Sequence, residues 1–211
     1  MNTVQPIRDV NQIRQMEQIL KDQNPRDYIL FALGIYLGRR ISDILNLKVQ
    51  DLRNKDFFII KEQKTGKNIR LSINPKLKEA LDKYFQGKKD NEYIIGSREY
   101  SQYITVKEKI INPITGKKKT VSTKIKNTAP NSPISRVMAW NILNDVARKV
   151  GLTEIGTHSL RKTFGMTLYE YTNKNIVLVQ KILNHSSPAV TLAYIGITQA
   201  EMDDAVCGIS Y

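Results

Sequence analysis

The two histidines of this chain each lie near a residue with which they could act on a common group. In GTHSLRKTFG, which runs from Gly156 to Gly165, His158 precedes Arg161 by three positions. Residues three apart on a helix share one face, so both side chains could donate hydrogen bonds to one anionic oxygen pair. A histidine that only caps a helix, beside an ion-paired arginine, gives the same pattern, and for this motif alone that interpretation is favoured.

The second histidine, His185, precedes Tyr194 by nine residues in NHSSPAVTLAYIG. On one continuous helix, at about 100° per residue, nine residues would turn these side chains to opposite sides. Pro188 argues against continuity, because proline breaks a helix interior but suits a helix start. We therefore expect a helix to end near Leu183, a turn at His185, and a second helix that brings Tyr194 to the same pocket. The alternative is that Tyr194 is a half-buried core tyrosine.

Two further cations lie in distinctive local settings. Arg40 follows Gly38 in YLGRRISDIL, at the start of a helix beside an apolar core helix. Lys64 lies in KEQKTGKNIRL, in the turn of a predicted hairpin, where a lysine would be extended. Ordinary surface charge is the alternative for each.

Most of the sequence predicts helices that would position these residues. Apolar residues recur at helical spacing, and the helix before Arg40 is nearly all apolar, with Asn24 as its cap, Pro25 at its first position and Gly38 at its end. The predicted helices cover about residues 10–20, 25–37, 40–45, 75–85, 134–150, 159–171, 176–183, 188–194 and 199–206.

Three segments are instead rich in β-prone residues. Residues 57–73 predict a hairpin around KTGK, and EYIIG, residues 92–96, predicts a short strand. The segment from Ser97 to Ser132 has two β-prone arms around NPITG and predicts a projecting basic hairpin or a mobile loop. We therefore expect one α+β domain over residues 1–211, mainly α-helical with a small antiparallel β-sheet, a basic insertion at about 97–132 and a C-terminal tail at about 197–211.

Charge is the informative feature of the composition. The 211 residues include 33 Lys and Arg against 20 Asp and Glu, a formal net charge of +13, which favours nucleic acid as the partner. An anionic membrane surface is less favoured, because the sequence has no basic amphipathic anchor, lipidation motif or apolar run of membrane-spanning length. The start lacks the apolar core of a signal peptide, and Cys207 is the only cysteine, so we expect a cytoplasmic location.

Four motifs occur in a defined order: GRRISDILNL, KTGK, HSLRKTFG and LNHSSPAVTLAYIG. Together they resemble the catalytic domain of the tyrosine recombinase (phage integrase) family over about residues 10–196. The resemblance implies a catalytic set of Arg40, Lys64, His158, Arg161, His185 and Tyr194. It also implies a supporting role for Asp43 and DNA contacts by Arg39, Lys67 and Lys162. Lys67 would replace Lys64 as the catalytic lysine if the turn is registered differently, and Asn184 stands where the family has glycine.

The chemistry implied by this family explains the residue types. The Tyr194 oxygen would attack a DNA phosphodiester, releasing a 5′-hydroxyl and leaving a 3′-phosphotyrosyl bond. Arg40 and Arg161 would clamp the negative charge of the transition state, with a bidentate geometry that lysine cannot copy. The covalent bond conserves the phosphodiester energy, so rejoining needs no ATP.

The remaining members of the set would handle protons and the phosphate. Tyrosine has a pKa of about 10 and needs a proton acceptor, for which His158 is the expected general base. Lys64 would protonate the leaving 5′-oxygen as general acid, and His185 would hydrogen-bond the phosphate. We expect no cofactor and no metal, because the sequence has neither P-loop glycines nor a metal-ligand cluster.

The resemblance implies a site-specific recombinase or integrase, bacterial or phage-encoded, that acts on double-stranded DNA as a homo-oligomer, with a tetramer in the synapse. A separate N-terminal helical domain is not expected, since the first catalytic arginine is residue 40, so the chain is either a minimal enzyme or a catalytic fragment. The alternatives are a type IB topoisomerase-like relaxing activity and a DNA-binding regulator without catalysis. All six expected catalytic positions are filled, which argues against the regulator.

Overall fold

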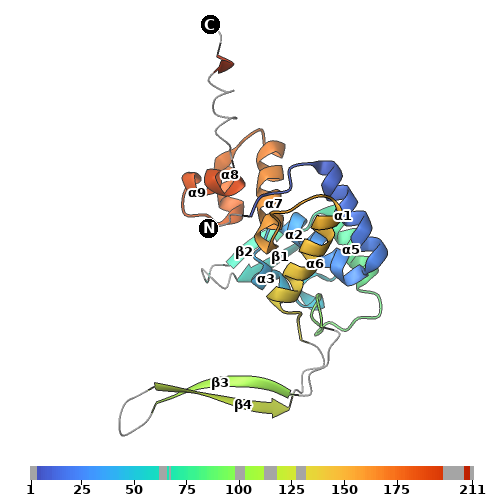
Figure 1. The fold of residues 1–211 in the computed structure, drawn as a ribbon, viewed down its shortest axis with the longest axis vertical. Helices are drawn as coiled ribbons and strands as arrows, with labels where there is room; N and C mark the ends of the chain where they lie inside the picture. Colours follow the sequence, from blue (N-terminus) through green and yellow to red (C-terminus); the bar gives the residue numbers. More distant parts are fainter. Residues whose placement is uncertain are drawn as a thin grey trace.

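The computed structural model describes residues 4–61, 66, 68–97, 103–111, 118–126, 132–196 and 207–209. It confirms a mainly helical α+β chain with small antiparallel sheets (Figure 1). The helices are α1 (Val10–Gln23), α2 (Pro25–Leu37), α3 (Ile41–Leu45), α4 (Val49–Leu52), α5 (Pro75–Tyr84), α6 (Arg136–Lys149), α7 (Thr157–Tyr171), α8 (Ile176–Leu183) and α9 (Pro188–Ile195). The strands are β1 (Phe57–Lys61), β2 (Asn68–Ser72), β3 (Tyr103–Ile111) and β4 (Lys118–Lys126).

Helix α2 is the central element, and its ends follow the predicted signals. Asn24 caps it by accepting a hydrogen bond from the Arg26 amide, Pro25 opens it, and Gly38 ends it in the left-handed conformation at φ 58°. The helix is buried on most of its surface, as expected for a nearly all-apolar sequence. It contributes to both hydrophobic clusters of the core, one with α3, α5 and the β1–β2 hairpin and one with α1, α6 and α7.

Close contact between α2 and α7 sets the geometry of the site. A Cβ atom on Gly34 would lie only 2.3 Å from Leu160, so glycine is needed for α7 to approach α2 this closely. Arg161 follows Leu160 in α7, and Arg40 follows the end of α2. The packing of these two helices therefore brings both arginines to the same end of α2.

One prediction about local structure was wrong, and one short helix was missed. Helix α4 was not predicted; it is a single turn, too short for a periodic apolar pattern to show. EYIIG is not a strand: Tyr93 makes one isolated bridge with Lys48, and the next residues turn. The amide of Val49, in the first turn of α4, donates to the Glu92 carbonyl. This segment therefore provides an acceptor for the N-terminus of α4 and does not extend a sheet.

Both predicted hairpins are present. Strands β1 and β2 pair antiparallel with Phe57 opposite Ser72, as expected for residues 57–73. Strands β3 and β4, within the basic insertion, pair antiparallel with Tyr103 opposite Lys126 and Ile111 opposite Lys118. Figure 1 shows the β3–β4 hairpin standing clear of the helical body, so the expectation of a projecting hairpin is confirmed for these strands. The predicted helix at 199–206 lies outside the described residues.

None of the helices in the described ranges is both long enough and apolar enough to span a lipid bilayer.

Candidate active site

Arg161 connects three segments of the chain. It lies in the second turn of α7, and its side chain is only 2% exposed. One terminal nitrogen, Nη1, donates to the carbonyl of Gly38 at 2.8 Å, and the other, Nη2, donates to the carbonyl of Leu183 at 2.6 Å. Gly38 ends α2 and Leu183 ends α8, so both acceptors are helix C-terminal carbonyls, which favour a cation. These bonds fix the guanidinium and use two of its five donors.

Arg40 enters the same site from the end of α2. The left-handed turn at Gly38 redirects the chain, and Arg40 then serves as the N-cap residue of α3 in an extended conformation. The Asp43 amide donates to the Arg40 carbonyl at 2.9 Å, and Asp43 itself is buried. Asp43 thus lies one turn from Arg40, where a supporting acidic residue was expected.

Arg39 does not match its prediction. A DNA contact was expected, but the side chain is 1% exposed, and its guanidinium donates to the carbonyls of Leu37 and Ile182 at 3.2 and 2.5 Å. The adjacent arginine, Arg40, is only partly buried. Arg39 therefore ties the end of α2 to α8, and a contact with DNA through this side chain does not fit its burial.

The turn between α8 and α9 is built as the sequence indicated. Asn184 ends α8 in the left-handed conformation at φ 54°, which asparagine tolerates better than most residues and which explains how it replaces a glycine. Ser187 then caps α9 and Pro188 occupies its first turn. His185 lies in the turn itself, with its amide bonded to the Gln180 carbonyl.

Thr191 holds the His185 ring. The hydroxyl of Thr191, fully buried, bonds to the Ser187 carbonyl at 3.2 Å and lies 3.1 Å from His185 Nδ1. Because the hydroxyl has one proton, a Thr191 that donates to Ser187 accepts from His185, which places the ring proton on Nδ1. In the neutral ring Nε2 is then an acceptor, and it becomes a donor when the ring is protonated.

Tyr194 lies where these groups converge. Its ring meets the His185 ring edge to face, with centroids 4.8 Å apart, and lies 6.0 Å from the Arg161 guanidinium carbon and 5.5 Å from the Lys162 ammonium. The hydroxyl oxygen is buried, without a hydrogen-bond partner among the described residues. Burial raises the pKa of Tyr194 above its usual value, and the positive charges of Arg161, Arg40 and Arg39 oppose that shift.

The other predicted residues are placed as follows. His158 is exposed in the first turn of α7, and Lys162 is half-buried, with a pKa lowered by desolvation. Lys64 and Lys67 lie outside the described residues, so the choice between them stays a prediction. The two strands that bracket them, β1 and β2, are in place.

Three residues of the site were missed from the sequence. Thr191 lies three positions before Tyr194, a helical spacing that could have revealed it. Phe164 packs against Gly38, where a Cβ atom would come within 2.0 Å of the ring. Arg8 donates to the carbonyl of Gly196, the residue that ends α9, and no local signal indicates a contact of this sequence separation.

The arrangement concentrates positive charge around one buried phenol. Arg40, Arg161 and Lys162 lie near Tyr194, which suits binding of an anion next to a tyrosine nucleophile. Within the described ranges, no group of three or more histidine, cysteine or acidic residues could hold a metal ion. A cavity of about 820 Å³ between α1, α2 and α5 is separate, and none of its lining residues is a predicted site residue.

The fold and the site define a tyrosine recombinase catalytic domain, and comparison with known proteins agrees. Residues 8–201 match the sequence model of the phage integrase family, so the chain belongs to that family. The probable integrase/recombinase YoeC of Bacillus subtilis is 41% identical over 199 residues, covering 94% of this chain and 93% of that protein. The tyrosine recombinase XerA of Pyrococcus horikoshii is 26% identical, covering 87% of this chain and 54% of its own length.

Solved structures share the fold. The crystal structure of XerA recombinase has a TM-score of 0.68 at 16% identity, covering 99% of this chain and 66% of that one. A lambda integrase dimer bound to a core site has a TM-score of 0.62 at 17% identity, covering 92% and 60%. The chain therefore spans almost all of YoeC but only about half the length of the XerA sequence that it matches.

Proposed function

We propose that this chain is a site-specific DNA recombinase or integrase that cuts and rejoins strands through a covalent 3′-phosphotyrosyl intermediate. The observation that carries the proposal is the buried Tyr194 hydroxyl beside the Arg161 guanidinium and the His185 ring. Proteins with the same fold support it: XerH is described bound to its difH substrate, and lambda integrase as a tetramer bound to a Holliday junction. The substrate proposed for this chain is likewise double-stranded DNA.

The cleavage step is an in-line displacement at phosphorus. The Tyr194 oxygen forms a bond to phosphorus as the bond to the 5′-oxygen breaks, and the reverse step rejoins the strand. Arg40 and Arg161 stabilise the charge on the non-bridging oxygens. Arg161 is already fixed by the Gly38 and Leu183 carbonyls, so little reorganisation is needed when the phosphate binds.

Proton transfer is assigned to three side chains. Burial makes Tyr194 harder to ionise, and an incoming phosphodiester partly neutralises the cations that oppose this effect, so a general base is required. His158 is the proposed base, and Lys64 or Lys67 the proposed acid for the 5′-oxygen. His185, with its Nδ1 held by Thr191, would present Nε2 to the phosphate and donate a hydrogen bond when protonated.

Assembly follows from the same proposal. Two strands must be cut and exchanged on each of two duplexes, which requires several copies of a site that contains one nucleophile. We propose a homo-oligomer on DNA, with a tetramer in the synapse, working in the bacterial cytoplasm on nucleoid or phage DNA.

Covalent trapping on nicked duplexes tests the function. A nick close to the cut lets the short released strand diffuse away, so a library of nicked duplexes incubated with the chain should yield a denaturant-resistant protein–DNA adduct. Tyr194→Phe should still bind DNA but form no adduct. Tyr171→Phe is the matched control, because Tyr171 is 85% exposed at the end of α7 and should leave the adduct unchanged. An undiminished adduct from Tyr194→Phe would refute the assignment.

A modified leaving group separates the two candidate lysines. A 5′-bridging sulfur leaves without protonation, so it should restore cleavage to the variant that lacks the general acid. We expect Lys64→Ala to be rescued and Lys67→Ala to show only weaker binding. Rescue of Lys67→Ala alone would exchange the two roles.

A further inference from the structure

The β3–β4 hairpin is a two-faced ribbon. In an antiparallel pair, residues directly opposite each other lie on the same face, and alternate pairs lie on opposite faces. The register alternates between pairs such as Thr105 with Lys124 and pairs such as Val106 with Thr123. One face, here called the lysine face, holds Tyr103, Thr105, Lys107, Lys109, Ile111, Lys118, Thr120, Ser122, Lys124 and Lys126.

The charges of the ribbon are divided unequally between its faces. The lysine face has five lysines, four hydroxyl-bearing residues including Tyr103, and no acid. The opposite face has one lysine, Lys119, one acid, Glu108, and is otherwise apolar apart from Thr123. Strands β3 and β4 contain no arginine, asparagine or glutamine, the residues that most often read base edges. This composition suits contacts with phosphates rather than with bases.

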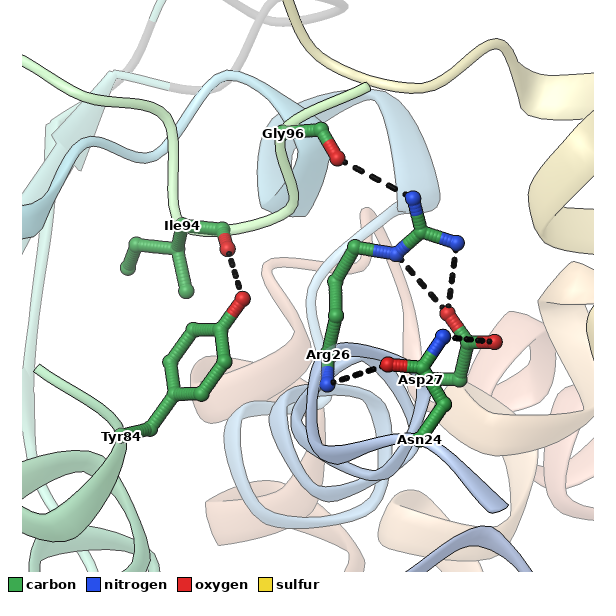
Figure 2. Close-up of polar contacts among 6 residues, drawn as sticks. All are labelled: Asn24, Arg26, Asp27, Tyr84, Ile94 and Gly96. Carbon is green, nitrogen blue, oxygen red and sulfur yellow. Dashed lines mark hydrogen bonds and ion pairs between the residues drawn. The ribbon is translucent and has the colours of Figure 1, made fainter. Parts of the chain in front are cut away.

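The chain segments that lead to the ribbon, here called its root (residues 94–97 and Ser132), are bonded to the helical body or to each other. The Arg26 guanidinium donates to the Gly96 carbonyl at 3.1 Å and forms an ion pair with Asp27 at 2.8 Å, and the Tyr84 hydroxyl donates to the Ile94 carbonyl at 3.0 Å (Figure 2). On the returning side, the Ser97 amide bonds to the Ser132 carbonyl at 2.7 Å. These bonds hold both chain segments that lead to the ribbon at the N-terminal end of α2.

The ribbon reaches beyond the site. Helix α2 has 13 residues, about 20 Å at 1.5 Å per residue, with the ribbon root at one end and Gly38 beside Arg161 at the other. Each strand has nine residues, so the ribbon itself is about 30 Å long, the length of roughly nine base pairs of duplex. The only extensive contacts of β3 and β4 with a described element are with each other, and Figure 1 shows both strands projecting from the body.

We propose that the lysine face of the β3–β4 ribbon binds the phosphate backbone of duplex DNA outside the cleavage site, and so extends the DNA footprint of the chain without reading sequence. This inference rests on the proposed function for its ligand. Charge complementarity favours DNA over a second copy, because each copy has a formal net charge of +13 and would repel this face.

Salt-dependent binding measures the contact. In a Tyr194→Phe background, which prevents covalent trapping, binding to a duplex of random sequence is followed by anisotropy across a range of KCl concentrations. Replacing Lys107, Lys109 and Lys124 together by serine should lower the slope of log affinity against log salt by about 3, close to 0.9 per lost phosphate contact. The same three residues changed to arginine should retain the slope.

Two neighbouring lysines provide the matched control. Lys118 lies on the lysine face and Lys119 on the opposite face, in the same strand and with the same chemistry. Lys118→Ser should lower the slope by about 1, whereas Lys119→Ser should leave it close to that of the parent. Equal losses from the two would refute the assignment of a binding face, because they would report net charge alone.

If the triple serine variant has an unchanged slope of log affinity against log salt, the proposal is wrong. That result is also the one expected if the ribbon binds an acidic protein and not DNA. The adduct assay is independent of this result. If the chain with Tyr194 forms no adduct but the slopes differ as expected, the recombinase function fails and the DNA-binding ribbon stands. If adducts form and the triple serine variant has the same salt slope as its parent, only the inference about the ribbon fails.

Discussion

In the Arg161–Tyr194 site, buried cations are fixed by backbone carbonyls from distant parts of the chain, whereas the β3–β4 ribbon is held by the pairing of its own two strands and by its root. The bonds of Arg161 reach across 123 residues to Gly38 and 22 residues to Leu183. Every ribbon pair joins residues of one local hairpin. The site therefore depends on the whole fold, and the ribbon does not.

This difference separates stability from binding. A substitution in the site should change folding and cleavage together, because Arg161, which is proposed to face the phosphate, also bridges helices. A substitution on the lysine face should change affinity for DNA and leave folding alone. The following four predictions test that separation, in decreasing order of effect.

Arg161→Lys should have the largest effect. Lysine keeps the charge but cannot bond to the Gly38 and Leu183 carbonyls and a phosphate in one plane. We expect adduct formation to slow by about 100-fold or more and the free energy of unfolding to fall by about 2 to 4 kcal/mol. Trapping kinetics and urea unfolding measure the two. Arg148→Lys, on the exposed surface of α6, is the control and should alter neither; a stable but inactive Arg161→Lys would break the predicted coupling.

Gly38→Ala should destabilise the chain by about 2 to 4 kcal/mol. Gly38 has φ 58°, and a Cβ atom there would lie 2.0 Å from the Phe164 ring, so backbone strain and overpacking add. Gly87→Ala isolates the strain, because Gly87 has φ 74° with open space around it and should cost only about 1 kcal/mol. Equal losses in urea unfolding would mean that Phe164 moves aside freely.

The Tyr194 pKa should appear as a pH dependence of stability. Burial raises this pKa above that of the unfolded chain, so the folded chain holds the proton more tightly. The contribution of the protonated Tyr194 phenol to the free energy of unfolding is intact below about pH 10. It is lost as the pH rises through the folded-state pKa. The difference in unfolding free energy between the parent and Tyr194→Phe should therefore fall above about pH 10, by at most about 1.4 kcal/mol per pH unit. A constant difference would show that the phenol is as easily ionised when folded.

The triple serine variant of Lys107, Lys109 and Lys124 should have the smallest effect on stability, within about 0.5 kcal/mol of the parent, because β3 and β4 have extensive contacts with each other and not with another described element. Thermal unfolding without DNA measures it. A larger loss would indicate that the ribbon contributes to the folded core, and the contrast with the site would fail.

Local signals predicted much of the fold. Asn24, Pro25 and Gly38 define α2 by capping, a fixed φ and a left-handed end, all properties of single residues. Pro188 predicted the break between α8 and α9, and with it the approach of His185 to Tyr194. These predictions succeeded because the physics that determines them acts over a few residues.

Long-range packing could not be predicted in the same way. Arg39 and Arg40 are adjacent and identical in type, and only the fold decides that Arg39 is buried against the end of α8. The carbonyl acceptors of Arg161 carry no sequence signal, since every residue has a carbonyl group. The turn at Tyr93 resembles a strand in composition, but its backbone pairs with the short segment before α4.

The two carbonyl contacts of Arg161 also bear on the order in which the chain is made. Gly38, Arg161 and Leu183 must all be present before the guanidinium is fixed, and Tyr194 follows all three in the sequence. During synthesis Tyr194, the proposed nucleophile, therefore leaves the ribosome after these three residues. We therefore expect a chain that ends before Tyr194 to form no covalent adduct with DNA, even where its basic residues still allow it to bind.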